Sequence, residues 1–276
     1  MATITTSTAA VQTELFYQDF GTGQPVVLLH GWPLSHRMWE RQVPVLNAHG
    51  FRTIAYDRRG FGHSGFPSGG YDYDTLAADL NDLLTELDLR DTVLVGFSMG
   101  GGEVARYLSR YGADRVSKVA LVASVTPFMM QTADNSDGVD PSVFEEMTAQ
   151  MTADRPAFLT RFGNQFFNQG LLTHPVSPEQ LDYAWNIAVM AQPQATLACA
   201  EAFAATDFRQ DLAAFTVPTL IVHGDADQTV PMKNSGDRTA KAIPSAQYVV
   251  IDGAPHGLYL THAEELNVVL LDFLRA

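Results

Sequence analysis

The chain of 276 residues has little cysteine, little positive charge and no long hydrophobic run. Its single cysteine, Cys199, excludes an internal disulfide and a cysteine-based zinc site. Only 17 lysines and arginines stand against 31 acidic residues, which argues against nucleic acid or an anionic membrane as a partner. No window approaches the roughly 18 apolar residues of a membrane helix. Residues 1–10 lack the basic and apolar regions of a signal peptide, so the sequence predicts a soluble, cytoplasmic protein.

Short apolar segments alternate with helical patterns along most of the chain. This alternation is typical of an α/β fold, in which crossover helices connect the strands of a parallel sheet. The length permits one large domain of this class or two smaller ones. We expect six buried strands, at 25–30, 52–56, 92–96, 116–124, 218–223 and 247–251, an antiparallel edge strand at 13–18, and helices at 73–87, 104–111 and 262–274.

The acidic residues follow a pattern of their own in the predicted helix 73–87. Leucines recur there at helical spacing, and Asp79, Asp82 and Glu86 lie on the opposite side. We interpret these carboxylates as a solvent-facing surface. The net charge of −14 is then a solubility feature and does not describe the substrate.

The strand pattern stops between residues 127 and 208, where helix-like sequence carries many large apolar side chains. Insertions in α/β proteins belong on loops at the carboxyl edge of the sheet. The sequence therefore predicts a core made of residues 1–126 and 209–276, with residues 127–208 inserted as a helical cap.

The most informative motif is Gly96-Phe97-Ser98-Met99-Gly100, which follows a predicted strand and precedes a predicted helix. That context identifies Gly-x-Ser-x-Gly as a nucleophile elbow, a sharp turn that presents the serine hydroxyl above the sheet. The residue after the serine supplies one backbone N–H of the oxyanion hole, here Met99. Ser98 is therefore the candidate nucleophile.

A serine hydroxyl needs a base, and the base needs an acid that orients it. In this architecture the acid and then the histidine follow the serine in the chain. Among eight histidines, His256 lies on the loop after the last strand and is the candidate base, whereas His223 ends a strand and is interpreted as loop packing. Asp225 and Asp227 follow the penultimate strand, and the pattern alone does not separate them.

Several motifs together resemble the serine α/β-hydrolases that include cofactor-free bacterial haloperoxidases, aryl esterases and perhydrolases. The resemblance covers nearly the whole chain. It rests on His30-Gly-Trp-Pro33, Asp57-Arg-Arg-Gly-Phe-Gly-His-Ser64, Gly96-Phe-Ser-Met-Gly-Gly-Gly102, Thr206-Asp-Phe-Arg209, His223-Gly-Asp-Ala-Asp-Gln228 and Ala254-Pro-His-Gly257.

The resemblance implies an α/β-hydrolase fold with a mostly parallel central sheet, flanking helices and the inserted cap. It implies the catalytic triad Ser98, Asp227 and His256, with Asp225 structural. It also implies that the backbone N–H of Trp32 is the second oxyanion donor.

The resemblance also implies a role for Pro33 in peracid formation, because family members that form peracids carry the same Trp-Pro pair. Proline restricts the residue before it, and our hypothesis is that the Trp32 carbonyl accepts a hydrogen bond from hydrogen peroxide or a peracid. The alternative is a plain turn proline.

A substrate pocket is expected between the elbow and the cap. It is predicted to be apolar and without a fixed charge. Its candidate lining residues are Trp32, Pro33, Val125, Met129, Phe144, Phe158, Phe162, Val230 and Met232.

The resemblance thus implies an esterase for small carboxylic esters or acids, with hydrogen peroxide as an alternative acyl acceptor and halide oxidation by the released peracid. It implies no cofactor and no metal, and relatives favour a homo-oligomer. Ser98 argues against the chemistry of relatives with an aspartate nucleophile. A lactamase or other amidase, a C–C bond hydrolase and a non-catalytic, receptor-like hydrolase fold remain as alternatives.

Overall fold

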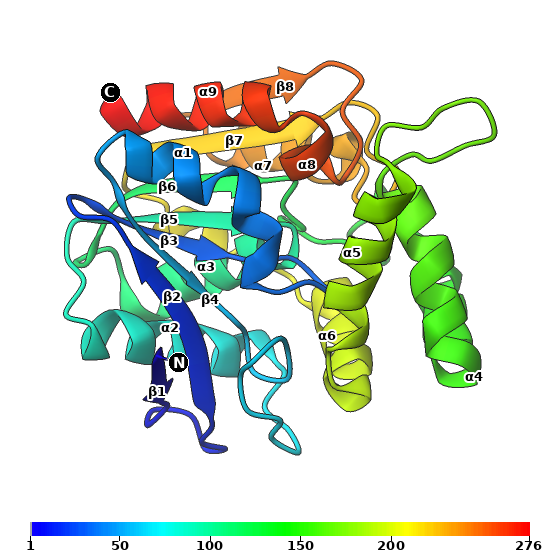
Figure 1. Ribbon diagram of the computed structural model, residues 1–276, viewed down its shortest axis with the longest axis horizontal. Coiled ribbons are helices and arrows are strands. Elements are labelled where there is room, and N and C mark those ends of the chain that lie inside the picture. Colours follow the sequence, from blue (N-terminus) through cyan, green and yellow to red (C-terminus); the bar gives the residue numbers. More distant parts are fainter. Residues whose placement is uncertain (1) are drawn as a thin grey trace.

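The computed structural model describes residues 2–276 and has an eight-stranded sheet at its centre (Figure 1). The strand order is β1-β2-β4-β3-β5-β6-β7-β8, and all neighbours from β4 to β8 are parallel. The strands are β1 (Ala2–Thr5), β2 (Glu14–Phe20), β3 (Pro25–Leu29), β4 (Arg52–Tyr56), β5 (Thr92–Phe97), β6 (Val116–Val122), β7 (Thr219–Gly224) and β8 (Gln247–Ile251). This confirms the predicted α/β class and its six parallel strands.

The antiparallel edge is longer than predicted. Strand β2 pairs with β4, as expected for an edge segment, but β1 adds a further strand outside β2, with Ala2 opposite Tyr17 and Thr5 opposite Glu14. The sequence analysis predicted no strand in this N-terminal segment, because the alternation Ala2-Thr-Ile-Thr5 is only four residues long and contains a single large apolar side chain.

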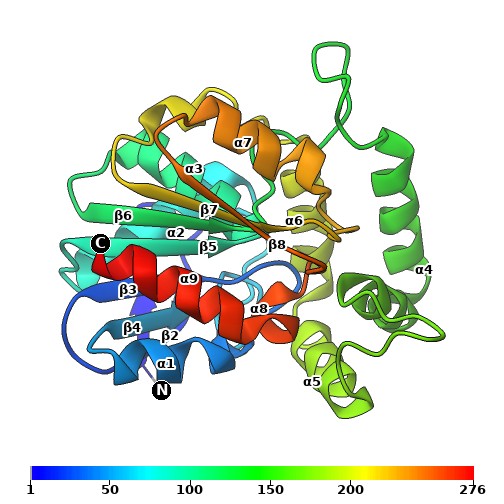
Figure 2. The same cartoon turned by 90° about the horizontal axis from the view of Figure 1, so that it is seen from above.

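Helices cover both faces of the sheet because its strands are apolar on both sides (Figures 1 and 2). In β3, Val26 and Leu28 belong to one core and Val27 and Leu29 to the other. The first core is completed by α1 (Val43–Ala48), α8 (Leu258–Thr261) and α9 (Ala263–Arg275), and the second by α2 (Tyr73–Glu86), α3 (Met99–Tyr111) and α7 (Gly236–Ala242). Short 3₁₀ turns, η1 (His36–Arg41), η2 (Asp211–Ala214) and η3 (Met232–Asn234), complete the connections.

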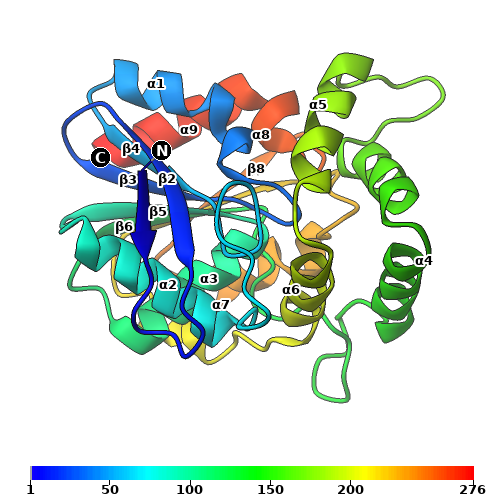
Figure 3. The same ribbon diagram turned by 60° about the horizontal axis from the view of Figure 1, so that its bottom comes forward.

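A block of three helices separates β6 from β7 and lies beyond the carboxyl ends of the parallel strands (Figures 1 and 3). These are α4 (Pro141–Phe166), α5 (Pro178–Val189) and α6 (Pro193–Ala205), and each has proline in its first turn, where no N–H is needed. Helix α4 breaks at Asp154, two residues before Pro156. These helices form the cap over the sheet edge. Within residues 2–276, no helix has the length and apolarity needed to cross a membrane.

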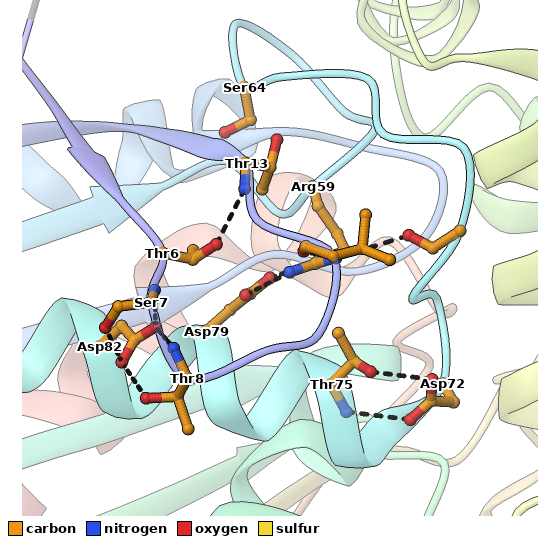
Figure 4. Close-up of polar contacts among 12 residues, drawn as sticks. Thr6, Ser7, Thr8, Thr13, Arg59, Ser64, Asp72, Thr75, Asp79 and Asp82 are labelled. Atoms are coloured by element: carbon orange, nitrogen blue, oxygen red, sulfur yellow. Dashed lines mark hydrogen bonds and ion pairs between the residues drawn. The ribbon is translucent and has the colours of Figure 1, made fainter.

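The interpretation of Asp79 and Asp82 as solvent-facing is wrong, although Glu86 is exposed. Both aspartates are buried beneath the N-terminal segment (Figure 4). Asp79 accepts two hydrogen bonds of 2.6 Å from the guanidinium of Arg59, and Asp82 accepts the backbone N–H groups of Ser7 and Thr8 at 2.6 and 2.8 Å. Part of the acidic composition therefore holds the fold together.

The ion pair beneath this segment predicts a loss of stability in Asp79→Asn. Arg59 is fully buried, so removing its counter-charge leaves an uncompensated cation in the interior. We expect the free energy of unfolding to fall by about 3–5 kcal/mol, measured by urea denaturation. The matched control is Asp88→Asn, since Asp88 is 73% exposed and is expected to contribute less than about 1 kcal/mol. Equal stability of the two variants would contradict the prediction.

Candidate active site

Ser98 occupies the sharp turn between β5 and α3. Its backbone has φ 53° and ψ −117°, a conformation that side-chain-bearing residues rarely adopt, and the residue is only 6% exposed. A Cβ on Gly96 would lie 2.6 Å from the Gly100 oxygen, and a Cβ on Gly100 would lie 2.5 Å from the Leu29 oxygen. The two glycines of the motif are therefore required by close backbone approach, and helix α3 begins directly after the serine, five residues before its predicted start.

Ser98, His256 and Asp227 form one chain of hydrogen bonds. The Asp227 carboxylate can only accept, so the Nδ1–H of His256 donates to Oδ2, across 2.6 Å. The neutral ring then accepts at Nε2 from the Ser98 hydroxyl, which is 2.9 Å away. This is the geometry in which an imidazole can take the proton of a serine hydroxyl.

The structure distinguishes the two aspartates that the sequence pattern leaves equivalent. Asp225 is exposed and accepts the backbone N–H of Gly253 at 2.7 Å, on the loop that leads to His256. Asp227 is buried and contacts His256 itself. Its second oxygen accepts the N–H groups of Thr229 and Val230 at 2.9 and 2.8 Å, which fixes the carboxylate plane.

His223 is a residue of this site that the sequence interpretation missed. Its Nε2–H donates to the Val230 carbonyl at 2.9 Å and lies 3.2 Å from Asp227 Oδ2. Burial raises the pKa of Asp227, but the charges and hydrogen bonds of His256 and His223 outweigh this effect and hold the pKa far below its ordinary value. Asp227 is thus ionised throughout the working range of an enzyme. The signal available in the sequence was the His223-Gly-Asp-x-Asp227 spacing at the end of a strand.

The loop after β3 lies against the nucleophile. A Cβ on Gly31 would lie 3.1 Å from the Ser98 Cβ and 2.6 Å from the Phe97 ring, so only glycine permits this approach. Trp32 follows Gly31 in a turn closed by a 2.9 Å hydrogen bond from Leu34 N–H to the Gly31 oxygen. On the other side of Ser98, Met99 is the first residue of α3, and its N–H has no acceptor within the helix. Of the two predicted donor residues, Met99 therefore follows Ser98 directly in the chain, and Trp32 lies on the loop that packs against Ser98.

A buried ionic network supports this loop from below. The Arg58 guanidinium donates to the His30 carbonyl at 2.9 Å and to Glu103 at 2.8 Å, and Tyr56 also bonds Glu103. Arg58 N–H donates to His30 Nε2 at 3.0 Å, so the His30 proton is on Nδ1, where it donates to Gly31 O. Burial and the neighbouring Arg58 lower the pKa of His30 to about 3. The ring therefore stays neutral, and this fixes the loop between His30 and Trp32.

A cavity of about 520 Å³ opens over Ser98 and His256. Most of the predicted lining residues surround it, and so do several that the sequence did not single out. The predicted ones are Trp32, Val125, Met129, Phe144, Phe158, Phe162 and Val230; the additional apolar ones are Val139, Val143, Met147, Phe203 and Pro231. Val143 and Met147 lie on α4 and Phe203 lies on α6, so the packing of these helices brings them here. Val139 precedes α4, and Pro231 follows Val230 on the loop after β7.

Two predicted residues do not line this cavity, and the expectation of no fixed charge is wrong. Pro33 lines a neighbouring cavity instead, and Met232 lies in η3, one residue beyond the Pro231 wall. Exposed Glu146 and Arg161 line the cavity mouth. The charge remains at the mouth, whereas the surroundings of Ser98 are apolar. Among residues 2–276, no group of three or more histidine, cysteine or acidic side chains is placed to hold a metal ion.

Fold and site together define the class of α/β-hydrolases with serine at the nucleophile elbow. The family profile described as the alpha/beta hydrolase fold matches residues 24–263. The chain therefore belongs to the α/β-hydrolase fold family, in the group of non-heme haloperoxidases, esterases and perhydrolases whose members it matches over nearly its whole length.

Three relatives illustrate the match. A protein of Synechocystis sp., provisionally named a non-heme chloroperoxidase, is 50% identical over 95% of both chains. The bifunctional esterase/perhydrolase DCH of Acinetobacter calcoaceticus is 36% identical over 95% of this chain and 96% of its own. The crystal structure of a bromoperoxidase from Bacillus anthracis is 49% identical, covers 100% of both chains and superposes with a TM-score of 0.95.

Proposed function

We propose that this protein is a serine esterase for small carboxylic esters that also catalyses perhydrolysis. The hydrogen-bonded chain from Ser98 through His256 to Asp227, at the base of an apolar cavity, carries this proposal. The names of the relatives support it, since they include an esterase/perhydrolase and haloperoxidases.

The first half of the reaction forms an acyl-enzyme. His256 Nε2 takes the Ser98 proton while the Ser98 oxygen attacks the acyl carbon, and Asp227 stabilises the resulting imidazolium. The N–H groups of Trp32 and Met99 stabilise the oxyanion of the tetrahedral intermediate. His256 then gives its proton to the leaving alcohol, and the ester bond breaks.

The second half releases the acyl group to one of two acceptors. His256 takes a proton from water or hydrogen peroxide as its oxygen attacks the acyl carbon, and the proton returns to Ser98 when the acyl–serine bond breaks. Water gives a carboxylic acid and hydrogen peroxide gives a peracid. A released peracid can transfer oxygen to bromide or chloride, forming hypohalite and the carboxylic acid, so halide oxidation needs no halide site on the protein.

The proposal is tested with p-nitrophenyl esters of increasing chain length, with and without hydrogen peroxide and bromide. We expect rapid release of p-nitrophenol from the acetate and butyrate, and bromination of an added phenol only when ester and peroxide are both present. Hydrolysis without peroxide-dependent bromination would restrict the function to the esterase. A lack of turnover of every ester would reject it.

Pro33 provides a prediction about the choice between water and peroxide. Proline restricts the backbone of Trp32, whose carbonyl is proposed to accept a hydrogen bond from peroxide. We expect Pro33→Leu to lower the ratio of peracid formation to ester hydrolysis by about tenfold, the equivalent of one hydrogen bond of roughly 1.4 kcal/mol. Peracid is measured by bromination and hydrolysis by p-nitrophenol release. An unchanged ratio would remove Pro33 from the mechanism.

A further inference from the structure

A second cavity of about 310 Å³ lies behind the active-site cavity. It is enclosed by the second half of α4, by α5 and by the residues that follow Trp32. Its walls are mainly apolar, with Leu34, Leu159, Phe166, Leu181 and Trp185 among them. Pro33 of the His30–Pro33 motif lines this cavity, but the reaction described above does not use the space.

One side chain, Phe162, lines both cavities. Its neighbours on α4 divide between the two, because Phe158 faces the active-site cavity and Leu159 faces the second one. Three aromatic rings lie next to the Phe162 ring, whose centroid is 5.2 Å from Trp32, 5.6 Å from Phe166 and 5.7 Å from Phe158. A phenyl ring thus forms part of the wall between the cavities, and a rotation about its side-chain bonds would connect them.

The position of Phe162 indicates which part of an ester would pass this point. The leaving alcohol must lie next to His256, which protonates it, and the acyl group extends to the other side of the reacting carbon. Phe162 packs edge-on against Trp32, whose N–H is a proposed oxyanion donor. The acyl group suits this opening better than the alcohol does, because it stays on Ser98 through both halves of the reaction, whereas the alcohol must leave through the cavity mouth to admit water or peroxide. A gap the width of one phenyl ring suits an unbranched hydrocarbon chain.

We propose that the second cavity is an extension of the acyl site, which holds the distal part of a medium-length, unbranched acyl chain when Phe162 turns aside. This inference rests on the proposed esterase function and names its substrate class. Esters of short acids fit the active-site cavity alone, whereas longer acyl chains need both cavities.

Gly163 offers a way to fill the second cavity from its own wall. It lines that cavity and not the active-site cavity, and a Cβ added there would have no heavy atom within 4 Å. Gly163→Leu therefore fills the space, and Gly163→Ala is the matched control that makes the same helix-favouring change without filling it. Ala184→Leu fills the cavity from the opposite wall on α5 and gives an independent second variant.

The measurement is the ratio of kcat/KM for p-nitrophenyl decanoate to that for the butyrate. We expect Gly163→Leu and Ala184→Leu to lower this ratio about tenfold relative to Gly163→Ala, since misfit of a few methylenes has effects of this size. Phe162→Ala is expected to raise the ratio about tenfold, and Phe162→Ala/Gly163→Leu to abolish that gain.

Each outcome decides a separate question. The proposal is contradicted by two results together. In the first, Gly163→Leu and Ala184→Leu keep the decanoate-to-butyrate ratio within about twofold of the Gly163→Ala control. In the second, Phe162→Ala/Gly163→Leu keeps the gain of Phe162→Ala, which would mean that the second cavity does not bind the acyl chain. Thermal unfolding checks that each variant is folded. Failure of the unmodified protein to hydrolyse the butyrate would count against the esterase itself and not against the cavity.

Discussion

Ser98→Ala is expected to lower kcat/KM for p-nitrophenyl butyrate by at least about 10⁴-fold, because the acyl-enzyme can no longer form. The residual rate would come from the oxyanion donors and from binding in the cavity. The peroxide-dependent bromination should disappear in the same variant, since the peracid is released from the same acyl-enzyme. Both activities are measured on one protein preparation.

The control for this variant is its fold. The backbone N–H of Ser98 donates to the Val122 carbonyl, and alanine retains this hydrogen bond, so the free energy of unfolding of the variant should lie within about 1 kcal/mol of that of the parent. Hydrolysis that persists in a folded Ser98→Ala variant would mean that another nucleophile acts. Loss of hydrolysis with retained bromination would separate the two reactions and contradict the shared intermediate.

Asp227→Asn is expected to cause the second large loss, about 10⁴-fold in kcat. An amide NH₂ next to His256 favours the ring tautomer with its proton on Nε2, and that tautomer cannot accept from the Ser98 hydroxyl. The backbone donors Thr229 and Val230 hold the side chain at position 227 in place, so KM should change little. Steady-state kinetics with the butyrate ester measures both constants.

Asp225→Asn is the matched control, because the two aspartates lie two residues apart on one loop. The Asp225 carboxylate accepts the backbone N–H of Gly253, and an asparagine oxygen can still accept that hydrogen bond. We expect its kcat within about twofold of the parent. A large loss in Asp225→Asn together with an active Asp227→Asn would reverse the assignment of the acid.

The residues next to Ser98 could be predicted from the sequence because backbone geometry dictates them. An elbow with φ 53° needs glycines on both sides, and those glycines are visible as a motif. The parallel strands could be predicted for a similar reason, since a strand buried on both faces is a continuous apolar run. The choice between Asp225 and Asp227 needed the family resemblance, because both follow the same strand.

Contacts between distant segments could not be predicted. Asp79 and Asp82 have the helical spacing of a solvated face, yet Arg59 and residues 7–8 cover them. Pro33 and Met232 are close to motifs in the chain but lie outside the cavity, whereas Phe203 and Met147 line it from helices without a motif. Which face of a cap helix meets the site depends on packing that a single sequence does not encode locally.

The cap is one uninterrupted segment that leaves the core after β6 and returns before β7 (Figure 1). It could therefore be exchanged as a unit between relatives without cutting any strand that carries the reactive side chains. Such an exchange would need to keep the hydrogen bonds that join α6 to the core, among them those from Trp32 Nε1 to the Thr196 carbonyl at 2.9 Å and from Gln192 N–H to the Gly60 carbonyl at 2.8 Å. With such attachments retained, together with the hydrogen bond from Gly257 N–H to the Phe166 carbonyl beside His256, a change of cap would alter the substrate range of this scaffold and leave the reacting side chains in place.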